Sequence, residues 1–169
     1  LRMDWKPRMA NITLIMKKED VSTSVPIHTR RIKSTRKVTK LITISVNPVP
    51  QQPQGSNSTV ATLEDTAYVL TVADLGFSDP NDSPPNTLNT VRFVTLPALG
   101  VIRLNGVAID ANDSVSAADV IGNDVTYTPA ANASGNGYAS FTFQVSDNGG
   151  TANGGDNVDS SPNTITINV

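Results

Sequence analysis

The strongest constraint on the fold is an alternating stretch at residues 141–147. Its apolar residues Phe141, Phe143 and Val145 alternate with polar residues, and the stretch ends at Asp147 before Asn-Gly-Gly. A period of two is typical of a strand with one face in a core and the other in solvent. Aspartate and glycine pairs are turn residues. The sequence therefore predicts a strand that carries aromatic rings into a core and places a carboxylate at the end of a sheet.

Six further short segments have the character of strands. They are expected at residues 59–63, 67–72, 90–96, 101–109 with a turn at 105–106, 124–128 and 164–169, and a short helical turn is expected within 113–122. Seven short strands separated by turn residues favour an all-β, seven-stranded, antiparallel sandwich of the immunoglobulin type. The chain has no cysteine, so its core has to hold this fold without disulfides.

Charge is divided unevenly along the chain. Residues 1–46 carry a net +8, from 11 Lys and Arg against 3 Asp and Glu, whereas residues 47–169 carry −10. Residues 1–40 show no sustained period and are interpreted as an irregular, poorly ordered basic arm; the alternative is an arm that binds an anionic surface. The acidic remainder argues against nucleic acid as a partner. No apolar run approaches the length of a membrane span.

A short sequence match suggests tandem repeats. Ile-Thr-Ile-Ser-Val at residues 42–46 and Ile-Thr-Ile-Asn-Val at residues 165–169 are 123 positions apart. A match at a fixed offset is typical of repeats. Residues 41–58 are therefore predicted to be the last strand of a preceding repeat followed by a linker rich in Pro, Gln and Ser, and residues 59–169 to be one whole repeat.

The predicted topology brings acidic residues together. Because each strand reverses the direction of the one before, Asp79 and Asp82, which follow the second strand, should meet Asp147, which follows the sixth. Carboxylate ligands without histidine or cysteine favour calcium. The alternative is that these residues are solvated turn residues, since Asp is common in turns.

Other acidic residues are assigned no ligand role from the residues alone. The solvated-turn interpretation is preferred for five of them at the same pole: Asp110, Asp113, Asp119, Asp156 and Asp159. Glu64 and Asp65 follow the first strand, so they are expected at the opposite pole of the sandwich.

The sequence contains no recognisable catalytic constellation. The only histidine, His28, lies in the basic arm, and no cysteine nucleophile is present. No nucleophile elbow or phosphate-binding loop is found. We therefore predict that the chain is not an enzyme.

Several motifs together resemble a known family. Residues 63–66 (Leu-Glu-Asp-Thr), 76–82 (Gly-Phe-Ser-Asp-Pro-Asn-Asp), 127–132 (Tyr-Thr-Pro-Ala-Ala-Asn), 141–147 and 164–169 resemble, in order and spacing, the cadherin-like tandem repeats of large bacterial surface adhesins. The resemblance implies a cadherin-like sandwich, a tandem arrangement, export to the cell surface and calcium at the junctions between repeats.

The resemblance also implies a set of calcium ligands. Glu64 matches the acidic residue after the first strand, Asp79 and Asp82 match the acids after the second, and Asp147 matches the acid that closes the sixth. The linker departs from the family pattern, which usually reads Asn-Pro-Val-Asn-Asp-Ala-Pro. Residues 47–53 read Asn-Pro-Val-Pro-Gln-Gln-Pro and lack the aspartate, which predicts weak or absent calcium binding at this junction.

Two functions follow from these observations. The first is a non-catalytic, extracellular repeat module of a bacterial adhesin, stiffened by calcium, whose partners are neighbouring repeats and host or matrix polysaccharide or protein. The alternative is a carbohydrate-binding module that recognises exopolysaccharide. Aromatic residues, on which sugars stack, make up only 5% of the chain, which counts against the alternative.

Overall fold

The computed structural model describes residues 12–16, 40–44 and 48–169, and the chain divides into two compact units, residues 1–48 and 49–169. In the first unit, β1 (Ile12–Met16) pairs antiparallel with β2 (Lys40–Ile44). Strand β2 lies where the last strand of a preceding repeat was predicted. Strand β1 lies inside the arm that was predicted to be irregular, so that prediction is wrong for residues 12–16. The predicted poor order of the remaining arm falls outside the described residues.

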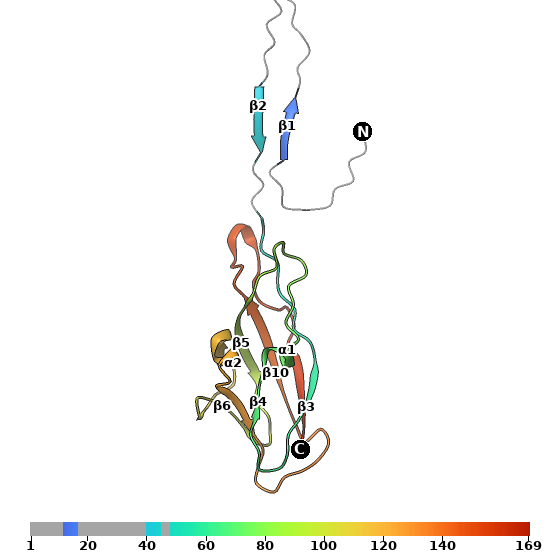
Figure 1. Cartoon of the computed structure of the whole chain (residues 1–169), viewed down its shortest axis with the longest axis vertical. Helices are drawn as coiled ribbons and strands as arrows, with labels where there is room; N and C mark the ends of the chain where they lie inside the picture. Colours follow the sequence, from blue (N-terminus) through green and yellow to red (C-terminus); the bar gives the residue numbers. More distant parts are fainter. Residues whose placement is uncertain (1–11, 17–39, 45–47) are drawn as a thin grey trace, which may run out of the picture. The chain divides into compact units, whose positions relative to one another are not determined.

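The second unit, called the body below, consists of two sheets (Figure 1). The first contains, in order, β3 (Ser58–Ala61), β11 (Asn163–Asn168), β10 (Ala139–Asp147), β5 (Leu88–Thr95) and β8 (Ser114–Ser116). The second contains β4 (Tyr68–Val69), β9 (Val125–Thr128), β6 (Val101–Leu104) and β7 (Val107–Ala108). Strands β3 and β11 are parallel, and all other pairs are antiparallel.

The prediction of an all-β protein is confirmed, and each of the seven expected segments contains a strand. The structure adds elements that were not predicted. Strand β8 precedes α2 (Ala117–Ile121), which is the expected helical turn, and α1 (Val72–Leu75) follows β4. Strands β3 and β11, which are the first and last strands of the body, pair in parallel, whereas a wholly antiparallel sandwich was expected.

Helix α1 begins shortly after β4, where hydrogen bonds between Thr71 and Asp74 favour a helix start over continued strand pairing. Asp74 accepts bonds from the backbone N–H of Thr71 (2.7 Å) and from its hydroxyl (2.8 Å), and Gly76 ends the helix in a left-handed conformation. A capping residue followed three positions later by an acid is a sequence signal for a helix start. The apolar run at 67–72 was nevertheless interpreted as one longer strand.

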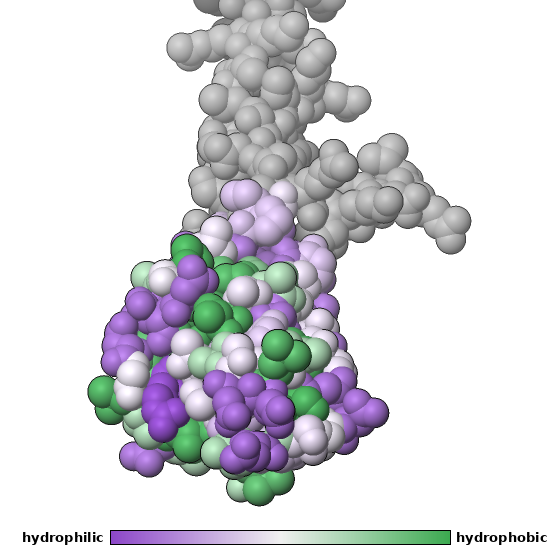
Figure 2. All heavy atoms as spheres, turned by 60° about the horizontal axis from the view of Figure 1, so that its bottom comes forward, coloured by the Kyte–Doolittle hydropathy of each residue, from purple (hydrophilic) through white to green (hydrophobic). Residues whose placement is uncertain are grey.

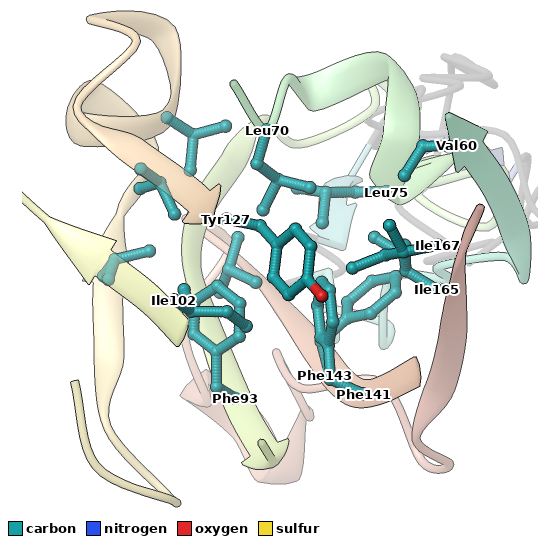
Figure 3. Packing of buried hydrophobic residues seen from close by; sticks show 14 of the residues in the cluster. Val60, Leu70, Leu75, Phe93, Ile102, Tyr127, Phe141, Phe143, Ile165 and Ile167 are labelled. Atoms are coloured by element: carbon teal, nitrogen blue, oxygen red, sulfur yellow. The ribbon is translucent and has the colours of Figure 1, made fainter. Parts of the chain in front are cut away.

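The core lies between the two sheets (Figure 3). From β10, the side chains of Phe141 and Phe143 lie in the same cluster as Phe93 of β5. The Phe93 and Phe141 ring centroids are 5.6 Å apart. Tyr127 of β9 is buried and donates its hydroxyl hydrogen to the carbonyl of Leu99 (3.0 Å). Burial raises the pKa of Tyr127 to about 12, as expected for a phenol removed from water.

The surface of the body is mixed in character. Figure 2 shows the end that lies at the bottom of Figure 1, where hydrophilic side chains cover much of the surface and apolar side chains form small groups between them. No helix among the described residues is long and apolar enough to cross a lipid bilayer.

The aromatic cluster should dominate the stability of the body. Phe143 is 0% exposed, so we expect Phe143→Ala to lower the free energy of unfolding by about 3–5 kcal/mol through lost transfer energy and the cavity left behind. Urea unfolding would measure this. Leu63, which is 75% exposed, provides the control, and Leu63→Ala should change the value by less than about 0.5 kcal/mol. Equal losses for both variants would contradict this placement of the core.

Candidate metal centre

Three aspartates meet at one end of the body. Asp79 and Asp82 lie in the α1–β5 loop (residues 76–87), and Asp147 is the last residue of β10. Position 147 is in phase with the core residues of β10, because inward-facing positions recur every second residue. A register shift between β10 and β5 lies between Ser146 and Asp147. The strand therefore places the carboxylate of Asp147 inside the end of the sandwich.

The three carboxylates are close together and largely shielded from solvent. One oxygen from each of Asp79, Asp82 and Asp147 lies within 4.8 Å of the others. Asp147 is 0% exposed and Asp79 is 4% exposed, whereas Asp82 is half-buried. Three like charges in such a space repel one another strongly. An arrangement of this kind requires protonation, a counter-ion or good hydrogen bonds.

Hydrogen bonds from N–H groups stabilise part of the negative charge of the three carboxylates. Asp79 Oδ2 accepts from the backbone N–H of Asn86 (2.6 Å), and Asp147 Oδ1 accepts from that of Gly149 (2.7 Å). Asp82 Oδ2 accepts from the Asn86 side-chain amide (2.6 Å) and from the backbone N–H of Gln51 (3.0 Å). Each aspartate thus has one oxygen held in place.

Two buried carboxylate oxygens have no partner among the described residues. Asp79 Oδ1 and Asp147 Oδ2 are both inaccessible to solvent and accept no hydrogen bond. A buried acceptor without a partner costs free energy. Burial is also the main reason why the pKa of Asp147 is raised; the Gly149 N–H lowers this pKa, and the charges of Asp79, Asp82 and Asp156 raise it further. A bound cation would satisfy both oxygens.

The donor set fits a hard cation. All three groups are carboxylates, and oxygen ligands suit calcium better than zinc or copper. Calcium takes 6–8 oxygen ligands, so the carboxylates would form one side of the shell. The backbone bonds to Asp79 and Asp147 fix the second oxygen of each carboxylate and leave the unpartnered oxygen for the ion.

The structure gathers three of the four residues that were singled out from the sequence. Glu64 is exposed and is not part of the group. It lies in the turn between β3 and β4, where its neighbour Asp65 accepts a hydrogen bond from the backbone N–H of Asn132 (3.0 Å) in the β9–β10 loop. A metal role for Glu64 stays a prediction.

The other acidic residues mostly have local roles. Asp119 completes the capping box of α2, whose N-cap is Ser116, by accepting from the Ser116 backbone N–H (2.9 Å) and hydroxyl (2.6 Å). Asp113 accepts from the backbone N–H of Asp110 (2.8 Å). Asp159 was interpreted as a solvated turn residue, which is wrong. It is buried, and one of its oxygens accepts from the Gly55 N–H (2.9 Å) and the Asn163 amide (2.6 Å).

Residues outside the predicted set position the centre. Asn148 and Thr87 join the two loops, because each donates a backbone N–H to an oxygen of the other (3.1 and 2.9 Å). A Cβ atom at Gly149 would lie 2.4 Å from the Asn86 amide nitrogen, so only glycine allows this approach. The Asn-Gly pair after β10 was recognised as a turn signal, but its contact with Asn86 depends on the fold.

The segment that leads into the body also touches the centre. Residues 49–57, called the lead-in segment below, were interpreted as part of a linker, but they belong to the compact unit. Gln51 binds Asp82, as described above, and Gln54 forms a two-way backbone bridge with Ser78 (2.8 and 2.9 Å). Pro53 is fully buried. The lead-in segment is therefore attached to the same loop that carries Asp79 and Asp82.

Comparison with known proteins finds no matching family model, no matching curated protein and no matching solved structure. The resemblance to cadherin-like repeats therefore stays a prediction.

Without divalent cations, Asp147 should make stability depend on pH. Its pKa in the folded chain is raised above the ordinary 3.8, so the folded state holds this proton more tightly than the unfolded state does. The resulting stabilisation is fully present below the ordinary pKa and is lost as pH rises through the raised value. Asp147→Asn should remove this loss, as measured by urea unfolding in chelator from acidic to neutral pH. Asp110→Asn, at an exposed site, should keep the wild-type profile; an unchanged profile in Asp147→Asn would contradict the assignment.

Proposed function

We propose that the body is a non-catalytic, cadherin-like repeat module of an extracellular bacterial adhesin, and that Asp79, Asp82 and Asp147 bind calcium. The observation that carries the proposal is the pair of buried, unpartnered oxygens, Asp79 Oδ1 and Asp147 Oδ2, beside a third carboxylate. Acidic clusters are common on protein surfaces, but buried acceptors without partners are rare.

The order of the strands supports a sandwich of the immunoglobulin type. Counting the seven predicted strands as A to G, β4, β9 and β6 give the order B–E–D, and β11, β10 and β5 give G–F–C. Both orders occur in the immunoglobulin fold. Strand β3, which corresponds to A, lies in parallel beside β11, instead of joining the sheet that contains B.

The strand pairing of the two units is compatible with a tandem arrangement. The matching isoleucines Ile44 and Ile167 occupy β2 and β11, and each strand pairs antiparallel with a strand that precedes it in the chain. An antiparallel pair such as β1–β2 is compatible with the last two strands of a preceding sandwich, although β1 was not predicted from the sequence.

The proposed role of calcium is to supply the positive charge that the buried carboxylates lack. By binding the ion, Asp79 and Asp82 would hold the α1–β5 loop at the site, and Asp147 would hold the end of β10 there. Because Gln51 donates its N–H to Asp82, an ordered Asp82 also orders the lead-in segment. This coupling is the route by which calcium would stiffen the junction without the aspartate that the linker lacks.

The described surface offers no observation that favours the carbohydrate-binding alternative. Every large hydrophobic side chain that is exposed in the described part of the chain is aliphatic. A sugar platform normally requires an exposed aromatic face. We therefore retain the calcium-dependent adhesin module as the proposed function.

Calcium should stabilise the chain in proportion to site occupancy. At about 100 times the dissociation constant, it should raise the free energy of unfolding by about 2.7 kcal/mol, and chelator should reverse this. Thermal and urea unfolding over a calcium titration would measure it. Because extracellular modules have dissociation constants of about 0.1–1 mM, the titration should extend to at least about 10 mM. Asp110→Asn should respond as the wild type does, whereas Asp147→Asn should not respond.

If the unfolding curve of the wild type is the same with calcium and with chelator, the calcium proposal is wrong. The stiffening can be tested separately on two copies of residues 47–169 joined in tandem, by comparing small-angle scattering and protease resistance with calcium and with chelator. If calcium binds but neither property changes, the ion stabilises the body without acting on the junction.

A further inference from the structure

We propose that Asp156 is a fourth ligand of this cation centre, supplied by the glycine-rich β10–β11 loop (residues 148–162). The inference rests on the proposed function, because it needs the three-carboxylate centre to take a cation. Sequence patterns alone do not separate Asp156 from the solvated turn residues. Its position relative to the lead-in segment and to Asp147 provides that reason.

The lead-in segment connects Asp156 to Asp82. The backbone N–H of Asp156 donates to the carbonyl of Pro50 (3.1 Å), and the next residue, Gln51, donates its N–H to Asp82 Oδ2 (3.0 Å). Two adjacent residues of the lead-in segment thus contact Asp156 and Asp82. At Gly155, a Cβ atom would lie 2.5 Å from the Pro50 carbonyl oxygen, so the loop can approach this closely only because the residue is glycine.

Strand β10 connects Asp156 to Asp147 from the other side. The backbone N–H of Asp147 donates to the carbonyl of Asn157 (3.0 Å), the residue after Asp156. An isolated bridge between Ser146 and Val158 continues this pairing. The backbone around Asp156 is therefore bonded to the lead-in segment on one side and to the end of β10 on the other.

The carboxylate of Asp156 is available to turn toward the centre. The residue is exposed, and its only described side-chain hydrogen bond is from the Val158 N–H to Oδ1 (3.1 Å). It does not belong to the group whose oxygens lie within 4.8 Å of one another, so its side chain has to rotate to reach a cation. The bond from Val158 is the described interaction that this rotation would break.

A fourth carboxylate would raise the calcium affinity of the centre and bring the β10–β11 loop to the ion. Calcium affinity is tuned by the number of charged ligands and by the rigidity of the site. Asp156 adds a charge and also draws the β10–β11 loop against the lead-in segment. The ion would then be surrounded by the α1–β5 loop, the end of β10 and the β10–β11 loop, with Pro50 and Gln51 between them.

Asp156→Asn is the variant that tests this role. Asparagine keeps the backbone N–H and a side-chain oxygen for Val158, so the loop should keep its conformation while losing one charge. We expect calcium affinity, measured by calorimetric titration of the full chain, to fall by at least about tenfold. Loss of a residue that only supports a ligand already costs about 10–100-fold, and Asp156 would contribute its charge directly to the ion. Asp110→Asn makes the same change in net charge at an exposed site outside the group and should leave the affinity unchanged.

NMR supplies a measurement that a purely structural role would not affect. In the wild type, calcium should shift the Val158 amide resonance and speed its hydrogen exchange, because Asp156 leaves Val158 when it turns; in Asp156→Asn this response should disappear. If the wild type binds calcium while both variants bind equally well, the role of Asp156 is overturned and the three-carboxylate centre stands. If the wild type does not bind calcium, both proposals fail.

Discussion

The structure depends on the alternation of β10, which continues past the aromatic core to a carboxylate. Phe141, Phe143 and Val145 face inward, and the same periodicity carries Asp147 into the interior at the end of the strand. The strand lies between β5 and β11, so its position is fixed by backbone hydrogen bonds on both sides. The body therefore cannot form its core without also burying this acid.

That burial has an electrostatic cost that the surrounding loops only partly offset. The N–H groups of Gly149 and Asn86 each satisfy one oxygen of a buried carboxylate. The second oxygens of Asp79 and Asp147 are left without partners among the described residues. Because buried polar atoms are usually paired, these two oxygens support the proposal that the centre binds a cation. The contrast with Asp159, whose hydrogen bonds are made within the body, supports the same proposal.

The lead-in segment is hydrogen-bonded to the acidic residues at the centre. Its residues do not supply a carboxylate, but Gln51 donates to Asp82 and Pro50 accepts from Asp156. A backbone attached in this way responds to the order of the side chains that it contacts. In the proposed function, charge compensation at the centre would therefore also order the lead-in segment. This is a different arrangement from the one that the family resemblance implied.

The sequence by itself determined the all-β class, the approximate positions of seven strands, and the convergence of Asp79, Asp82 and Asp147. These follow from periodicity and from strand reversal, which are local or topological properties. Tertiary structure alone decided which acids are buried without partners, and that Asp159 is fully paired. It also decided that the supposed linker is part of the body. These outcomes depend on contacts between residues far apart in the chain, such as Gly55 with Asp159, and no local pattern encodes such contacts.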